Sequence, residues 1–228
     1  IKGTILPAGT GSDVWAIYMY DGSVFSRKYT GTWGGEESIY VNTQNLGNQD
    51  EAPASAVVDA NGVVHVVYGS GDQVATILKP RIYYKHNAGG GWPGAATRID
   101  TGAGPNDAGF YPSISLDSST GGTYFFWIER KWNPADSWSI MGKKNVSGSW
   151  SFIPIGNPDT ASPKQYQTSI YSVPGESNMC WQWTQNTTGT IEVIFDRIPE
   201  FDQVIIPVLF VILLFIAVFK NESIKKRK

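Results

Sequence analysis

The chain has 228 residues, of which 25 are glycine, 13 proline, nine tryptophan, eleven tyrosine and ten phenylalanine. This composition argues against a disordered chain and against a helical bundle. Charged residues make up 17% and the net charge is −2, so no nucleic-acid partner is predicted. The single cysteine, Cys180, excludes an internal disulfide framework, and two histidines are too few for a histidine metal centre. We therefore expect no metal ion and no other cofactor.

Landmark residues recur along the chain at intervals of 58 or 59 residues, which indicates an internal repeat. The recurring sets are Trp33, Trp92 and Trp150; Pro53 and Pro112; Asp59 and Asp117; Tyr68 and Trp127; and Lys85 and Lys144. Each copy reads as four short β-strands separated by turns. In the second copy, Asn61-Gly62 favours a type I′ hairpin turn.

The predicted strands in chain order fall into four groups. They cover residues 2–6, 14–20 and 24–29; then 53–59, 63–68, 81–85 and 95–100; then 112–117, 123–128, 139–144 and 151–155; and finally 167–172, 178–183 and 190–196. A long loop is expected over 69–80. A repeated four-stranded antiparallel unit is typical of a β-propeller blade. We predict an all-β fold, a partial β-propeller of about three to four blades over residues 1–196, and we expect further blades upstream of Ile1.

Glycine and tryptophan recur in the turn before each fourth strand, at Tyr29–Trp33, Asn87–Trp92 and Asn145–Trp150. With the strand pattern, these turns resemble those of sialidase-like, BNR-type propellers over roughly residues 9–196, although the aspartate of that family's Asp-box is absent. The resemblance implies a structural turn on the outer rim. Sialidases use three arginines, a tyrosine–glutamate pair and an acid aspartate. Only Glu129 and Arg130, after a second strand, stand where such groups are expected.

Loops between blades and loops between second and third strands open on the same face of a propeller. Here they place aromatic and acidic side chains together, and such surfaces suit sugars. The candidate ligand-binding residues are Glu51, Asp107, Phe110, Tyr111, Trp132, Asp136, Trp138 and Tyr166. For Phe110 and Tyr111 the alternative is packing between blades, and for the acidic residues it is a solvated loop.

These residues favour a recognition or structural module for carbohydrate or glycoprotein over an enzyme, and no catalytic residue is assigned. The alternative is a sialidase-like glycoside hydrolase whose catalytic residues lie partly upstream. A third reading is a spacer that binds no ligand. The sequons at Asn145 and Asn186 are candidate glycosylation sites in turns. His65, in the middle of an alternating strand, is expected to be a packed or surface residue.

The C-terminal segment 204–219 contains sixteen consecutive residues without a charge and predicts a transmembrane helix. The basic residues of the tail, 220–228, then predict a cytoplasmic C-terminus and an extracellular propeller at the cell surface. The alternative is a buried core helix.

Within the linker 197–203, the motif Ile198, Pro199, Glu200 and Phe201 stands immediately before the apolar span. A short motif, an apolar span and a basic end, in this order, resemble the PEF-type C-terminal sorting signals of archaeal surface proteins. The resemblance implies a membrane transpeptidase as a partner and removal of the span. The alternative is a permanent membrane anchor.

Overall fold

The computed structural model describes residues 2–7, 13–41, 54–70, 73–74, 77–78, 80–88, 90–100, 107–117, 120–131, 137–153, 165–172, 179–187 and 190–197. Within these residues the protein is all-β, as predicted. No helix among them is long and apolar enough to cross a membrane. The predicted span 204–219, the tail 220–228 and the motif at 198–201 lie outside the described residues.

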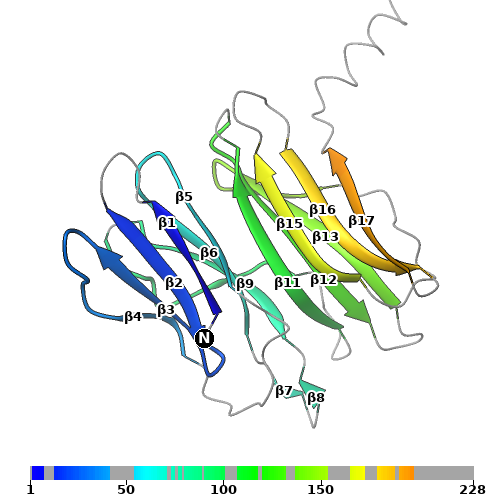
Figure 1. The fold of residues 1–228 in the computed structure, drawn as a ribbon, viewed down its shortest axis with the longest axis horizontal. Coiled ribbons are helices and arrows are strands. Elements are labelled where there is room, and N and C mark those ends of the chain that lie inside the picture. Colours follow the sequence, from blue (N-terminus) through cyan, green and yellow to red (C-terminus); the bar gives the residue numbers. More distant parts are fainter. Residues whose placement is uncertain are drawn as a thin grey trace, which may run out of the picture.

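Four antiparallel sheets succeed one another in chain order (Figure 1). The first contains β1 (Lys2–Pro7), β2 (Val14–Tyr20), β3 (Ser23–Tyr29) and β4 (Glu37–Tyr40). The second contains β5 (Ser55–Val58), β6 (Val64–Ser70), β9 (Arg81–His86) and β10 (Thr97–Arg98). The third contains β11 (Asp107–Leu116), β12 (Thr123–Lys131), β13 (Ser137–Val146) and β14 (Ser149–Ile153). The fourth contains β15 (Gln165–Ser172), β16 (Met179–Thr187) and β17 (Thr190–Arg197).

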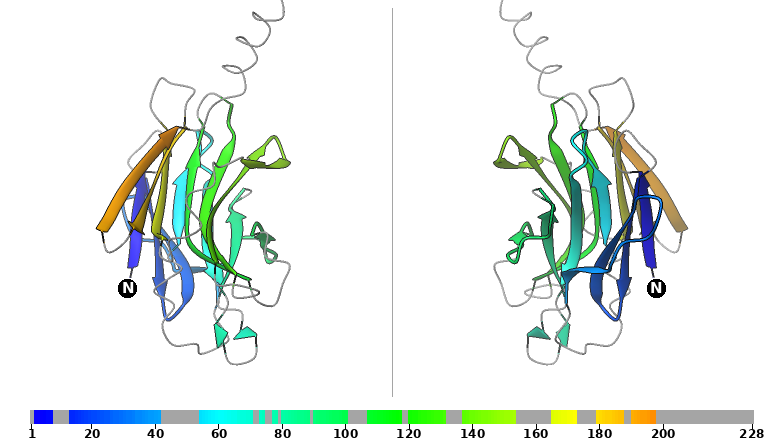
Figure 2. Two further views of the ribbon diagram at one scale, coloured as in Figure 1. Left: turned by 90° about the vertical axis from the view of Figure 1, so that its right-hand side faces the viewer. Right: turned by 90° about the vertical axis from the view of Figure 1, so that its left-hand side faces the viewer.

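The predicted strands are therefore present, with ends that differ by a few residues. The segment between β6 and β9 was predicted to be a loop throughout, and this was wrong. Its strands β7 (Gln73–Val74) and β8 (Ile77–Leu78) pair as a small sheet of their own. This pair lies at the lower end of the molecule in Figures 1 and 2.

The first strands of successive sheets are neighbours, because β1 contacts β5, β5 contacts β11 and β11 contacts β15. Each sheet pairs its strands in the order of the chain, if the β7–β8 pair is set aside. The sheets pack face to face on the next sheet along the chain (Figures 1 and 2). This is the arrangement of propeller blades.

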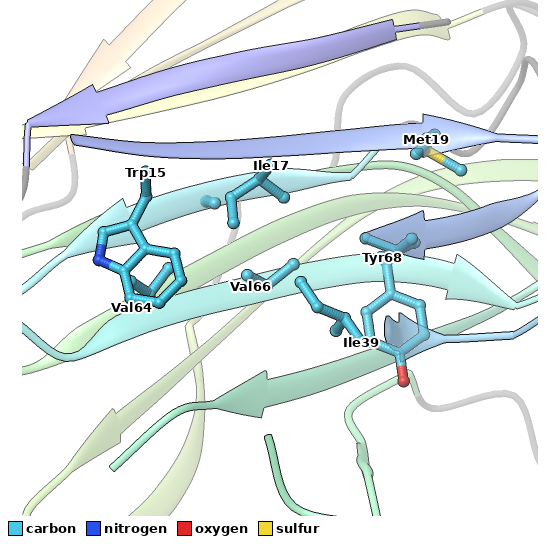
Figure 3. Packing of buried hydrophobic residues seen from close by; sticks show 9 residues of the cluster. Trp15, Ile17, Met19, Ile39, Val64, Val66 and Tyr68 are labelled. Carbon is cyan, nitrogen blue, oxygen red and sulfur yellow. The ribbon is translucent and has the colours of Figure 1, made fainter. Parts of the chain in front are cut away.

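The interface between the first and second sheets is a continuous apolar layer (Figure 3). It buries Trp15, Ile17, Met19, Val24 and Ile39 of the first sheet against Ala56, Val64, Val66 and Tyr68 of the second. The next interface follows the same plan. It buries Val67, Ile82, Tyr84 and Ile99 of the second sheet against Ile114, Phe125 and Trp127 of the third.

One lysine crosses each of these two interfaces. The Nζ atom of Lys85 donates to the carbonyl oxygen of Ile39 at 2.7 Å, and that of Lys143 donates to the carbonyl oxygen of Ile99 at 3.4 Å. Burial lowers the pKa of both lysines. The sequence had matched Lys85 with Lys144, which was wrong by one residue. Lys85 pairs with Val66, and it is Lys143 that pairs with Phe125, the residue equivalent to Val66.

The hairpin between β5 and β6 is closed by a hydrogen bond from the Gly62 N–H to the Asp59 carbonyl oxygen at 3.0 Å. Gly62 has φ +78°, but Asn61 is not in the left-handed region, so the predicted type I′ turn was wrong. Asp59 supplies the reason. Its Oδ1 atom accepts hydrogen bonds from the N–H groups of Asn61 and Val63, which fixes a longer turn.

The second and third sheets approach each other closely at Gly109 in β11. Its N–H donates to the carbonyl oxygen of Pro80 at 2.8 Å, across the interface. A Cβ atom at this position would lie 2.5 Å from Cγ1 of Ile82, which is fully buried. Only glycine allows this backbone approach.

We therefore predict that Gly109→Ala lowers the free energy of unfolding by about 1–3 kcal/mol, because a stiff β-branched side chain in a close-packed core cannot move aside. Chemical denaturation measures this change. Gly91→Ala is the matched control, since a Cβ atom there meets nothing within 4 Å. Equal stability of the two variants would contradict the packing described.

Candidate functional site

The candidate site lies where β12 ends and where β11 and β13 begin, at the same end of the sheets as the β7–β8 pair (Figure 1). Phe110 and Trp138 meet there in one apolar cluster. We call this group the Trp138 cluster; it comprises Ala108, Phe110, Tyr111, Ile128 and Trp138. Of the predicted ligand-binding residues, the structure brings together Phe110, Tyr111 and Trp138.

The rings of this cluster form a short aromatic row with a cation at its end. The ring centroids of Phe110 and Trp138 are 5.6 Å apart, and those of Phe110 and Tyr111 are 6.5 Å apart. The guanidinium carbon of Arg130 lies 4.7 Å from the centroid of Trp138, which is a cation–π contact. Phe110 is only 5% exposed, which fits the alternative expectation that it packs between blades. Tyr111 and Trp138 are half-buried.

The backbone at Tyr111 is unusual. Its φ is +50°, and the register of β11 with β12 shifts between Phe110 and Ser113. A left-handed conformation at a bulky residue costs free energy, and bulges with such residues are common beside binding sites. The bulge re-aims the Tyr111 side chain relative to a regular strand.

The other predicted residues are placed only in part. Glu51, Trp132 and Asp136 lie outside the described residues. Asp107 begins β11 and Tyr166 lies in β15, but the structure describes only their backbone. The prediction that Asn145 and Asn186 lie in turns was wrong, because both lie near the ends of strands. Asn145 is in β13 just before the turn at Ser147 and Gly148, and Asn186 is in β16.

A second aromatic group was not predicted. Tyr40 stacks on Tyr68 with centroids 5.3 Å apart, and Tyr68 stacks on Tyr83 at 6.1 Å. Burial, followed by the neighbouring phenols of Tyr40 and Tyr83, raises the pKa of Tyr68 well above its usual value. In the sequence, the repeat that matches Tyr68 with Trp127 singles out Tyr68 as an aromatic position of the blade. Tyr40 is not one of the repeated residues, so the stack itself could not be predicted.

Glu129 and Arg130 were predicted to stand where a sialidase-like site has its functional groups, although no catalytic role was assigned to them. Glu129 is 2% exposed and pairs in the sheet with Gly109 and Ser139. Gly109 approaches the second sheet, whereas Ala108, Arg130 and Trp138 occupy the next positions along their strands. Because side chains alternate along a strand, Glu129 and Arg130 face opposite sides of the third sheet. They do not act on one ligand side by side.

A polar group on the opposite end of the second sheet contains His65. Its Nδ1 atom lies 2.7 Å from the Tyr84 hydroxyl and its Nε2 atom 3.3 Å from Oδ2 of Asp59. Tyr84 contacts Phe125 and Trp150 of the third sheet edge-on. His65 is thus a packed residue, as the sequence predicted, and it links the Asp59 turn to the interface between the sheets.

The described part of the chain holds no group of three or more His, Cys, Asp or Glu side chains arranged for a metal ion.

Neither a family model nor a curated protein sequence matches the chain. Solved structures do. A protein of unknown function from Dyadobacter fermentans has a TM-score of 0.53 at 11% identity, covering 86% of this chain and 60% of its own. The GH43 endo-arabinanase from Bacillus licheniformis has a TM-score of 0.49 at 12% sequence identity, and the match covers 86% of this chain and 70% of the arabinanase. The intramolecular trans-sialidase from Ruminococcus gnavus has a TM-score of 0.46 at 12% sequence identity, and the match covers 86% of this chain and 42% of the trans-sialidase. At such identities these matches concern the fold alone.

The His65 group predicts how stability depends on pH. Burial holds the pKa of His65 below its ordinary value of 6.5, although Asp59 acts in the opposite direction. Protonation therefore favours the unfolded chain, and the free energy of unfolding should fall as pH drops through about 6.5. Asp59 has a lowered pKa and titrates below this window: burial would raise it, but hydrogen bonds from Val63, His65 and Asn61 outweigh burial.

Chemical denaturation between about pH 8 and about pH 5 measures this effect. We expect His65→Gln to flatten the dependence. His86→Gln, at an exposed position of the same sheet, should keep most of it, because the neighbouring His86 is the smallest of the causes that act on the pKa of His65. A wild-type slope unchanged in His65→Gln would show that another group is responsible.

Proposed function

We propose that the end of the molecule around the Trp138 cluster is a recognition surface for carbohydrate or glycoprotein. The observation that carries the proposal is the pairing of half-buried Tyr111 and Trp138 with the Arg130 guanidinium, beside a backbone bulge. Aromatic rings accept the C–H face of a sugar, and a stacked guanidinium directs its in-plane donors outward toward hydroxyl or carboxylate oxygens.

The covered and uncovered rings have different roles in this proposal. Phe110 is buried, and its ring packs against the rings of Tyr111 and Trp138. Arg130 lies over one face of Trp138, so Trp138 contributes its edge and its remaining surface, and Tyr111 contributes its ring. We propose that the remaining predicted residues complete the surface with polar and aromatic contacts; they are Glu51, Asp107, Trp132, Asp136 and Tyr166.

Glycoside hydrolysis is the second candidate, because a buried carboxyl group, Glu129, lies at the same end. Hydrolases of the usual kind need two carboxyl groups about 5–10 Å apart, both reaching the sugar. Glu129 faces the second sheet rather than the Trp138 cluster. The geometry of the described residues therefore favours binding over hydrolysis.

We propose further that residues 204–219 tether the propeller to a membrane, with the propeller outside the cell, until a sorting transpeptidase recognises the motif Ile198–Phe201 and removes the span. The support is the uncharged segment followed by a basic tail. In a host without such a transpeptidase, alkaline extraction of membranes should retain the full chain and release a chain that ends at residue 197. Release of both would contradict the tether.

Glycan binding is tested with an array probed by the whole chain and two variants. We expect selective binding to be lost, by about tenfold or more, in Trp138→Ala, because truncating a central aromatic residue typically costs more than 1 kcal/mol. Trp132→Ala should weaken binding of the same glycans.

Phe152→Ala is the matched control, since Phe152 is a 54% exposed aromatic residue on the outer strand of the same sheet. Binding that survives Trp138→Ala, or that Phe152→Ala removes equally, would place the surface elsewhere. Release of free sugar from a bound glycan would instead favour the hydrolase.

A further inference from the structure

The first sheet differs from the second and third because the described residues cover only one of its faces. Along β2 buried and less buried residues alternate: Trp15, Ile17 and Met19 are 9%, 1% and 9% exposed, whereas Tyr20 is 63% exposed. Along β12 every residue from Thr123 to Glu129 is buried. Since side chains alternate across a strand, β12 is covered on both faces and β2 on one.

The uncovered face of the first sheet nevertheless carries the pattern of a covered face. In the second and third sheets, the face that packs on the preceding sheet presents an aromatic residue on the second strand, a lysine on the third and a tryptophan after it. These are Tyr68, Lys85 and Trp92 in one sheet and Trp127, Lys143 and Trp150 in the other.

The first sheet presents Tyr18, Arg27 and Trp33 at the same positions. Backbone pairing establishes the match, because Ala16 pairs with Arg27 as Val66 pairs with Lys85 and Phe125 with Lys143. Tyr18 then follows two residues later, as Tyr68 and Trp127 do.

The matched residues make contacts across a sheet interface in the covered cases. Lys85 and Lys143 each donate to a carbonyl oxygen on the preceding sheet or just beyond its last strand, and Nε1 of Trp92 donates to Oγ of Ser26 at 2.8 Å. In the first sheet the equivalent residue, Arg27, instead donates to a carbonyl oxygen of the segment that follows its own strand. Nε and Nη2 of Arg27 both donate to the carbonyl oxygen of Gly34, at 3.0 and 2.9 Å.

Among the described parts of the chain, no neighbouring sheet lies against Trp33 either. Trp33 is 47% exposed, and its ring centroid lies 5.3 Å from that of Tyr29 in its own sheet. Trp150, at the equivalent position, stacks on Phe125 with centroids 5.4 Å apart and meets Tyr84 of the preceding sheet. A large aromatic residue in the pattern of Trp150 is thus left at the surface.

The two covered interfaces also define what such a face packs against. On the preceding sheet, beside Trp15 and Met19 in the first sheet and Tyr84 in the second, one β-branched aliphatic residue lies on or next to each of the second, third and fourth strands. These residues are Ile17, Val24 and Ile39 in the first sheet, and Val67, Ile82 and Ile99 in the second. In both cases the carbonyl oxygen that accepts from the lysine belongs to the last isoleucine, Ile39 or Ile99.

We propose that the face of Tyr18, Arg27 and Trp33 is a docking surface for one further four-stranded sheet of this repeat. Its packing face carries β-branched aliphatic side chains on its second, third and fourth strands. A carbonyl group at its fourth strand accepts the hydrogen bond that Arg27 now gives to Gly34. Trp33 enters the interface, as Trp92 and Trp150 do in theirs.

The test is a fusion that supplies such a sheet. A second copy of residues 1–53 is placed ahead of the whole chain, because its face of Ile17, Val24 and Ile39 already packs on an equivalent surface. Acrylamide quenching of Trp33, isolated by comparison with a Trp33→Phe version of each protein, should fall from that of an exposed to that of a buried tryptophan. The matched control carries Ile17→Asp and Val24→Asp in the added copy only, and it should leave Trp33 accessible.

A second fusion carries an added copy of residues 54–106 instead, with the face of Val67, Ile82 and Ile99. This fusion keeps the test decisive if the first added sheet does not fold. Trp33 accessibility that is unchanged in both fusions overturns the proposal. So does protection of Trp33 in the unfused chain that grows with protein concentration, because a second copy would then be the occupant.

Discussion

The structure depends on one constraint: an inner sheet must bury both of its faces, and each face must match its neighbour. The matching is chemical as well as geometric. A face with β-branched aliphatic residues receives a face with aromatic residues, and a lysine closes the interface by donating to a carbonyl group at the far sheet, as Lys85 does to Ile39. An unpaired carbonyl group or ammonium in such a layer would be costly, so the lysine both satisfies the carbonyl group and keeps its own charge solvated or bonded.

Face-to-face packing also determines where recognition residues stand. With both faces buried, the sheets leave their ends for ligand contact, and the residues at one end come from the starts of β11 and β13 and the end of β12. The bulge at Tyr111 changes the alternation there, so Phe110 packs into the sheet interface while Tyr111 is turned from the regular strand direction. Glu129 and Arg130 are neighbours on β12 and therefore point to opposite faces of the third sheet. Arg130 contacts the Trp138 cluster, whereas Glu129 is buried toward the second sheet.

Much of this could be predicted from the sequence, because the strand pattern and the 58–59-residue repeat are local signals. Most strands and their grouping into four sheets followed from them, whereas β4 and the β7–β8 pair were missed. The placement of Phe110, Tyr111 and Trp138 near one another followed as well. Other features depend on contacts between distant residues. The turn at Asn61 is decided by the Asp59 carboxylate, the role of Gly109 by Ile82 of another sheet, and the position of Lys143 by a one-residue difference between repeats. The φ of Tyr111 is likewise not predicted by any pattern in the sequence, and the repeat singles out only Tyr68 of the stack formed by Tyr40, Tyr68 and Tyr83.

The most direct test of the central claim is to locate a bound glycan on the protein. Hydrogen exchange should be measured with and without a glycan that an array selects. If the glycan binds at the Trp138 cluster, backbone amides at the start of β11 and of β13, residues 107–111 and 137–140, gain protection. Amides at the turns of the opposite end, 59–63 and 147–148, gain none. Protection confined to the opposite end, or to the outer strand β14, would contradict binding at the Trp138 cluster.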